Sequence, residues 1–107
     1  MTGKYLGKIT SAEFGVDRDY YYDFGLYLTF RIDALSVSGM YVANINPKCK
    51  YATPTGRQDA VLEMNEKVAA ILKDAKVSSV SGLIGKPVEV TIENRTFKDF
   101  RILTEVL

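Results

Sequence analysis

The chain has 107 residues, of which 47% are hydrophobic and 25% are charged, and its formal net charge is +1. This composition is typical of ordinary globular proteins, so we expect a single domain over residues 1–107. The sequence has no histidine and one cysteine, which excludes histidine-based catalysis, an intramolecular disulfide and a cysteine-based zinc cluster. The near-neutral charge provides no general electrostatic argument for binding nucleic acid or membranes.

The first residues, Met1–Tyr5, lack the apolar region of a secretion signal, and no segment is apolar enough to span a bilayer. We therefore expect a cytoplasmic protein without a membrane partner.

A first strand is predicted over Tyr5–Phe14, where alternate residues would face opposite sides of a sheet. The polar, aromatic segment Gly15–Asp23 follows it and contains the adjacent tyrosines Tyr20, Tyr21 and Tyr22. Tyrosine is enriched at binding surfaces, so this segment is either a recognition loop or a homo-oligomer contact. The alternative is that these tyrosines tuck under the sheet. The carboxylates nearby do not match a calcium loop, and we predict no metal site.

The clearest strand is predicted over Phe24–Asp33, because its even-numbered residues from Phe24 to Ile32 are all apolar. Tyr27 and Arg31 would lie on its other, partly exposed face. Residues Ala34–Gly39 are interpreted as a connection, and a third strand is predicted over Met40–Asn46.

An amphipathic helix is predicted over Thr55–Lys76, after a loop over Lys48–Thr55. Apolar residues recur at spacings of three and four along this helix, which is typical of a face that packs on a core. They are Val61, Met64, Val68, Ile71, Leu72 and Ala75. Thr55 and Gln58 have the spacing of a capping box.

The C-terminal part contains a short irregular segment over Val77–Gly85, a strand over Val88–Glu93 and a strand over Thr96–Val106. A turn at Asn94-Arg95 would join these two strands. The element order is therefore βββ-α-ββ, which predicts an α+β fold with a five-stranded antiparallel twisted sheet. A partly open OB-like barrel has the same order and remains open as an alternative.

Aromatic and basic residues gather along the predicted second and third strands and in the loop before the helix. The candidate ligand-binding residues of this group are Tyr27, Arg31, Tyr41, Lys48, Lys50, Tyr51 and Arg57. Stacking on aromatic rings with Lys or Arg on phosphate is typical of proteins that bind nucleotides or single strands. Solvated lysines and half-buried tyrosines are the structural alternative. No nucleophile–base pair can be named, so we expect a non-enzymatic protein without a cofactor.

Segments throughout the chain resemble small proteins encoded by bacterial phages and prophages, for which no activity is established. They are Ala12–Gly15, Gly25-Leu26, Ala75–Val77, Leu83, Gly85–Val90 and Phe100–Leu107. The resemblance implies a host bacterial cytoplasm and either DNA handling or interference with host defence. It assigns no residue a role.

Three hypotheses follow from these patterns. The first is a protein that binds a nucleotide-like small molecule and thereby sequesters a host defence signal. The second is an OB-like module that binds single-stranded nucleic acid, for which the near-neutral charge is unfavourable. The third is a protein–protein inhibitor that acts through the tyrosine loop or an edge strand.

Overall fold

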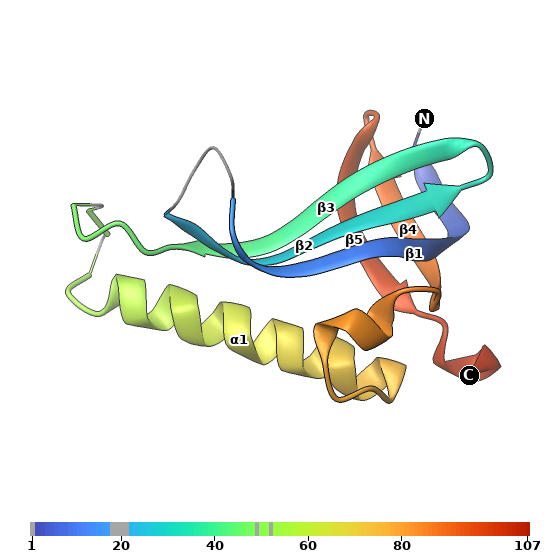
Figure 1. The fold of residues 1–107 in the computed structure, drawn as a ribbon. Helices are drawn as coiled ribbons and strands as arrows, with labels where there is room; N and C mark the ends of the chain where they lie inside the picture. The colour runs from blue at the N-terminus through green and yellow to red at the C-terminus, as the bar shows by residue number, and fades with distance from the viewer. Residues whose placement is uncertain (1, 18–21, 49, 52) are drawn as a thin grey trace.

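The structure is a computed structural model that describes residues 2–17, 22–48, 50–51 and 53–107. It has the predicted order of three strands, a helix and two strands (Figure 1). The strands are β1 (Gly3–Val16), β2 (Asp23–Ile32), β3 (Leu35–Asn44), β4 (Pro87–Glu93) and β5 (Thr96–Ile102), and the helix is α1 (Gly56–Ala75). Two 3-10 turns, η1 (Val80–Leu83) and η2 (Thr104–Val106), complete the described elements.

The five strands form one antiparallel sheet in the order β3-β2-β1-β4-β5. β1 is long enough to pair with β4 through its first half and with β2 through its second half. The sheet bends there, so the β4–β5 hairpin crosses one end of the three-stranded part while α1 lies along one face (Figure 1). The α+β prediction is confirmed. The two edge strands, β3 and β5, do not pair, so the sheet is not closed into a barrel.

A β-bulge in β1 changes which residues face the core. Ile9 pairs with Phe30 on the face that α1 covers, which we call the inner face, whereas Ser11 pairs with Thr29 on the opposite, outer face. Thr10 is the extra residue, and its hydroxyl donates to the Thr29 carbonyl at 3.2 Å. The simple alternation predicted for this strand is therefore wrong beyond Ile9.

β3 begins at Leu35, five residues before the predicted start. Only Asp33 and Ala34 separate it from β2, and Asp33 adopts a left-handed backbone with φ of 54°. Asp tolerates this conformation better than most residues, so a two-residue turn forms without glycine. Residues Leu35–Gly39, most of the predicted connection Ala34–Gly39, are instead paired with β2.

α1 has nearly the predicted bounds, with Thr55 and Lys76 as its flanking residues. The predicted capping box is wrong. The Thr55 hydroxyl donates to Asp59 Oδ2 at 3.1 Å, and it accepts no hydrogen bond from a backbone N–H of the first turn. At the other end Lys76 is left-handed, with φ of 58°, and its N–H donates to the Lys73 carbonyl. A residue in this conformation terminates the helix.

The core lies between the inner face of the sheet and α1. The helix contributes Met64, Val68, Ile71 and Ala75, as predicted from their spacing, and the sheet contributes mainly β2 and β4. Phe30 is at its centre with 0% exposure, stacked on Phe97 and tilted against Phe100 at ring centroid distances of 5.4 and 4.9 Å. Such aromatic contacts add to the stabilisation from area burial.

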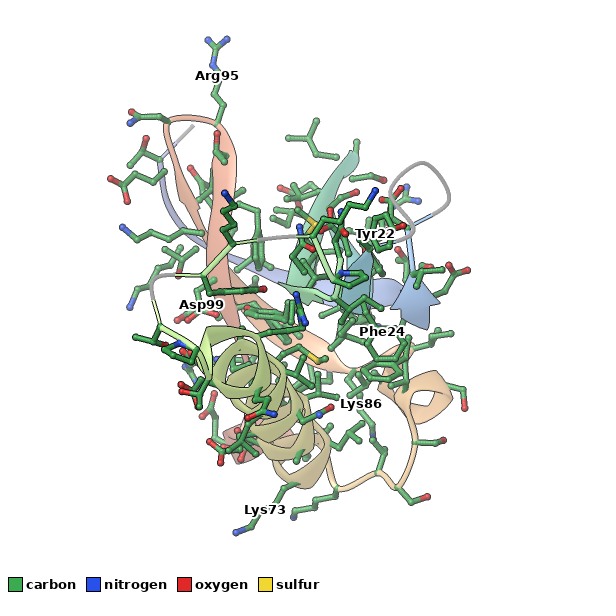
Figure 2. The ribbon with its side chains drawn as sticks, turned by 90° about the vertical axis from the view of Figure 1, so that its left-hand side faces the viewer. Tyr22, Phe24, Lys73, Lys86, Arg95 and Asp99 are labelled. Carbon is green, nitrogen blue, oxygen red and sulfur yellow. The ribbon has the colours of Figure 1, made fainter. Side chains whose placement is uncertain are left out.

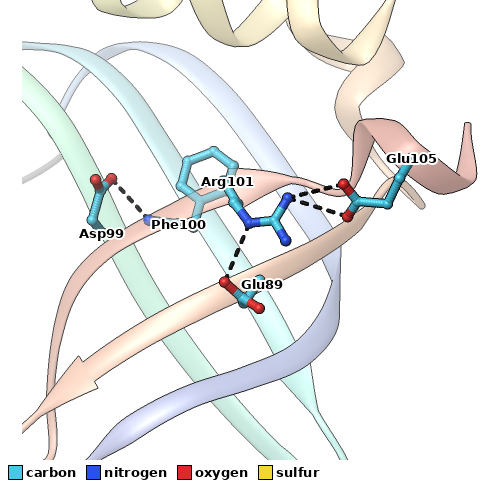
Figure 3. Close-up of polar contacts among 5 residues, drawn as sticks. All are labelled: Glu89, Asp99, Phe100, Arg101 and Glu105. Atoms are coloured by element: carbon cyan, nitrogen blue, oxygen red, sulfur yellow. Dashed lines mark hydrogen bonds and ion pairs between the residues drawn. The ribbon is translucent and has the colours of Figure 1, made fainter.

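β5 ends at Ile102, earlier than predicted, because the chain turns into η2. Arg101 ties this end to the sheet, since its Nε donates to Glu89 Oε1 at 3.2 Å (Figure 3). Its Nη1 donates to both carboxylate oxygens of Glu105, at 3.1 and 3.2 Å. Among the described residues, no helix has the length and apolar character needed to cross a membrane.

Candidate binding groove

Side chains on the outer face of the sheet form successive rows across three strands. Residues paired across β1, β2 and β3 share a face, so the register gives the rows Ser11, Thr29 and Ser38, then Glu13, Tyr27 and Met40. The first row carries three hydroxyls, and the second carries a carboxylate, an aromatic ring and a thioether. The helix covers the opposite face, so these rows remain accessible.

A groove of about 640 Å³ lies over these two rows. Asp17 extends its lining at the end of β1, and Thr96, Phe97 and Lys98 of β5 form a wall along the β3 edge. The bend of the sheet produces this wall, because it brings the β4–β5 hairpin beside β3. We call this site the outer-face groove.

The end of the groove at Glu13 and Asp17 is acidic. Tyr27 of β2 lies opposite Glu13, and its hydroxyl donates to the Asp23 carbonyl at 2.6 Å. Burial raises the pKa of Tyr27, and the negative charges of Asp17 and Asp23 raise it further. The phenol is therefore neutral at physiological pH. Within the described ranges, no three acidic, histidine or cysteine side chains gather to hold a metal ion.

The opposite wall carries a positive charge that is already paired. Lys98 Nζ donates to Glu93 Oε2 at 2.6 Å, and this bond raises the pKa of Lys98. Phe97, next to Lys98 in β5, is half-buried and packs against β3. A Cβ at Gly39 would lie 2.7 Å from carbons of the Phe97 ring. Close approach of the two edge strands therefore depends on a glycine at position 39.

Of the predicted site residues, Tyr27 and Tyr41 are among those that line the groove, and Arg31 lies in the next row of the outer face. Tyr22 immediately precedes β2 and is exposed. Tyr20 and Tyr21 lie outside the described residues.

Tyr41 lies on β3 opposite Leu26, so its ring is on the inner face and not beside Tyr27 and Arg31. Its hydroxyl donates to Asp99 Oδ1 at 2.6 Å, on the part of the hairpin near α1 (Figure 2). Lys67 of α1 completes this cluster, with Nζ 3.8 Å from Asp99 Oδ1 and 5.3 Å from the Tyr41 ring centroid. The cluster joins the two unpaired edge strands and the helix.

Polar contacts in this cluster shift two pKa values in opposite directions. Burial raises the pKa of Tyr41 far above its ordinary value, and the hydrogen bond to Asp99 raises it further. Although burial opposes ionisation of Asp99, the hydrogen bonds from Tyr41 and from the Phe100 N–H lower the pKa of this carboxyl.

We expect the Tyr41→Phe variant to lose less stability than the wild type as pH rises above about 10. An unfolded tyrosine ionises near pH 10, whereas folded Tyr41 stays protonated, so its contribution is complete below pH 10 and is lost above it. Urea unfolding at pH 8, 10 and 11 measures the difference, because the remaining tyrosines are common to both proteins. Parallel pH profiles would contradict this assignment.

The remaining predicted residues lie around the connection between β3 and α1. The Tyr51 hydroxyl donates to the Asn44 carbonyl at 2.7 Å, and Arg57 Nη2 donates to the Asn46 carbonyl at 2.9 Å. Lys48 and Lys50 are exposed. None of these four residues lines the outer-face groove. Tyr51 and Arg57 therefore hold the connection in place, and the predicted group is divided between two faces of the sheet.

A second hollow, of about 670 Å³, lies between β3 and α1. Tyr41, Val42 and Met64 line it, together with charged residues of α1. Tyr41 is committed to Asp99 there, so this hollow offers fewer uncommitted polar groups than the outer-face groove.

Comparison of the chain with family models, with curated proteins and with solved structures finds no match. The function of the protein is therefore inferred from the geometry of the site.

Proposed function

We propose that the protein is a non-enzymatic module that binds a nucleotide-like ligand in the outer-face groove. The observation that supports this most directly is the combination of Tyr27, Met40 and Phe97 with a row of hydroxyls in one groove. Pockets for small molecules typically combine apolar and aromatic side chains with a few placed polar groups. Met40 is 57% exposed, so its thioether is accessible to a ligand in the groove.

Each part of the groove suits a part of such a ligand. A base would pack against Tyr27 and Met40, where an aromatic ring and a polarisable thioether are adjacent. Glu13 would accept hydrogen bonds from an exocyclic amine or from sugar hydroxyls, and the Ser11–Thr29–Ser38 row would contact the sugar. Binding without turnover would serve to sequester a signal molecule, the role that the phage resemblance favours.

A second candidate function is the binding of single-stranded nucleic acid. The exposed faces of strands two and three are where OB folds bind oligonucleotides, and the outer-face groove lies there. The acidic residues Glu13 and Asp17 oppose this function, because strand binders require a positive groove along the phosphate backbone. A free nucleotide can keep its phosphates away from this end.

A thermal-shift panel at low salt tests the proposal. It contains cyclic dinucleotides, ADP-ribose-type compounds, nucleoside triphosphates and a dT oligonucleotide. A ligand at a hundred times its Kd stabilises the fold by about 2.7 kcal/mol, which corresponds to several degrees. We expect Ser38→Trp to abolish the shift, because this exposed position lines the groove and an indole there would fill part of it. Ser78→Trp, at an exposed position that does not line the groove, is the matched control.

The possible results separate the two functions. A shift with a free nucleotide that Ser38→Trp removes and Ser78→Trp retains supports the proposal. A shift with the oligonucleotide alone, weakening steeply with salt, would support strand binding instead. No shift with any compound, or a shift that both variants retain, would refute the groove as the site.

A further inference from the structure

Two positive side chains lie directly opposite each other on the outer face, one row beyond the hydroxyls of the groove. Lys8 of β1 pairs with Arg31 of β2, and Arg31 pairs with Ser36 of β3. All three side chains are exposed. We call Lys8, Arg31 and Ser36 the cationic row.

The fold itself does not account for this arrangement. Like charges directly opposite each other on neighbouring strands are destabilising. Neither Lys8 nor Arg31 forms an ion pair with any of the residues that the structure describes. Arg31 uses its Nε to donate to the Asp33 carbonyl at 3.1 Å, which orients the guanidinium. Among the described residues, no hydrogen bond or ion pair engages its two terminal nitrogens.

The cationic row continues the outer-face groove at the end away from its carboxylates. Along β2, Arg31 lies four residues from Tyr27, with Thr29 between them on the same face. This separation is ~13 Å along the strand. Charge therefore changes along the face from negative at Asp17 and Glu13, through neutral hydroxyls, to positive at Arg31 and Lys8.

We propose that the cationic row is a phosphate subsite, so that the ligand of the groove is a nucleotide whose terminal phosphate lies far from its base. Nucleoside polyphosphates and dinucleotides have this extent, whereas a nucleoside monophosphate is short for it. An arginine fork, an ammonium and a hydroxyl are suitable donors to phosphate oxygens. This inference depends on the proposed function for the base end of the ligand, but the phosphate subsite can be tested without it.

Binding of inorganic tripolyphosphate, measured by calorimetry at low salt, tests the subsite alone. We expect Lys8→Gln and Arg31→Gln each to weaken binding about tenfold, as for a lost hydrogen bond between charged groups. Lys4→Gln is the matched control for Lys8, since Lys4 is exposed on β1 two rows away. Arg95→Gln is the control for Arg31, because Arg95 points away from the tip of the β4–β5 hairpin (Figure 2).

Weaker binding by the two variants of the cationic row, with both controls unchanged, supports the subsite. No binding to the wild type, or equal losses in all four variants, would overturn it. The nucleotide arm uses AMP, ATP and the dT oligonucleotide. Nucleotide binding that Ser38→Trp abolishes but Lys8→Gln and Arg31→Gln leave unchanged would refute the subsite and retain the proposed function. Tripolyphosphate binding that depends on the cationic row, without any nucleotide binding, would retain the subsite and refute that function.

Discussion

Replacing Phe30 by alanine is expected to lower the free energy of unfolding by about 3–5 kcal/mol. This is a large share of the stability of a domain of this size, which is typically 5–15 kcal/mol. The physical reason is that Phe30 is completely buried and contacts both Phe97 and Phe100, so its removal leaves a cavity where β2 and β5 meet. Urea unfolding followed by circular dichroism measures the change.

Phe14→Ala is the matched control for this prediction. Phe14 also lies on the inner face and meets another ring, Phe24, at a centroid distance of 5.1 Å, but it is 43% exposed. We expect a loss of about 1 kcal/mol, because its partial burial leaves less area to lose. Equal losses for the two variants would show that the core is not centred on Phe30.

Gly25→Ala is the second substitution with a large expected effect. A Cβ at position 25 would collide with the Tyr41 carbonyl oxygen and lie 2.8 Å from Val42 Cα, both in the neighbouring backbone. Backbone atoms cannot move aside without breaking the pairing of β2 with β3. We expect a destabilisation of at least about 1–3 kcal/mol, the usual range for overpacking, measured by urea unfolding.

The structure supplies a control for Gly25 in the adjacent strand. Gly15 of β1 pairs directly with Gly25, yet a Cβ there would meet no atom within 4 Å. Gly15→Ala should therefore be neutral or stabilising by about 0.4–1 kcal/mol, because alanine reduces the freedom of the unfolded chain. If both alanines were tolerated equally, the close approach of β2 and β3 at Gly25 would be contradicted.

The fold class could be predicted because its main signals are local. The spacing of Met64, Val68 and Ile71 defines the buried face of α1, and the apolar alternation from Leu26 to Phe30 defines the inner face of β2. Both patterns arise from the geometry of a single element, so no contact between distant segments is needed to recognise them.

The site was predicted only in part because it depends on register and on the bend of the sheet. Tyr41 pairs with Leu26 and thus turns inward, but a pairing between strands cannot be read from either strand alone. The run Leu35–Gly39 contains two serines and a glycine, which are common in loops, so the start of β3 was misplaced. Phe97 and Lys98 reach the groove only because the hairpin crosses the sheet.

The unpaired edges of β3 and β5 have a mechanical consequence for the groove. The hairpin is hydrogen-bonded to β1, but only side chains such as Tyr41, Asp99 and Phe97 connect it to β3. A backbone ladder would fix the distance between these strands more rigidly than side-chain contacts do. We therefore expect the width of the groove to vary, because the β4–β5 hairpin can move relative to β3 while it stays hydrogen-bonded to β1. The groove could then bind ligands of different thickness between the rigid outer face of the sheet and the movable β5 residues.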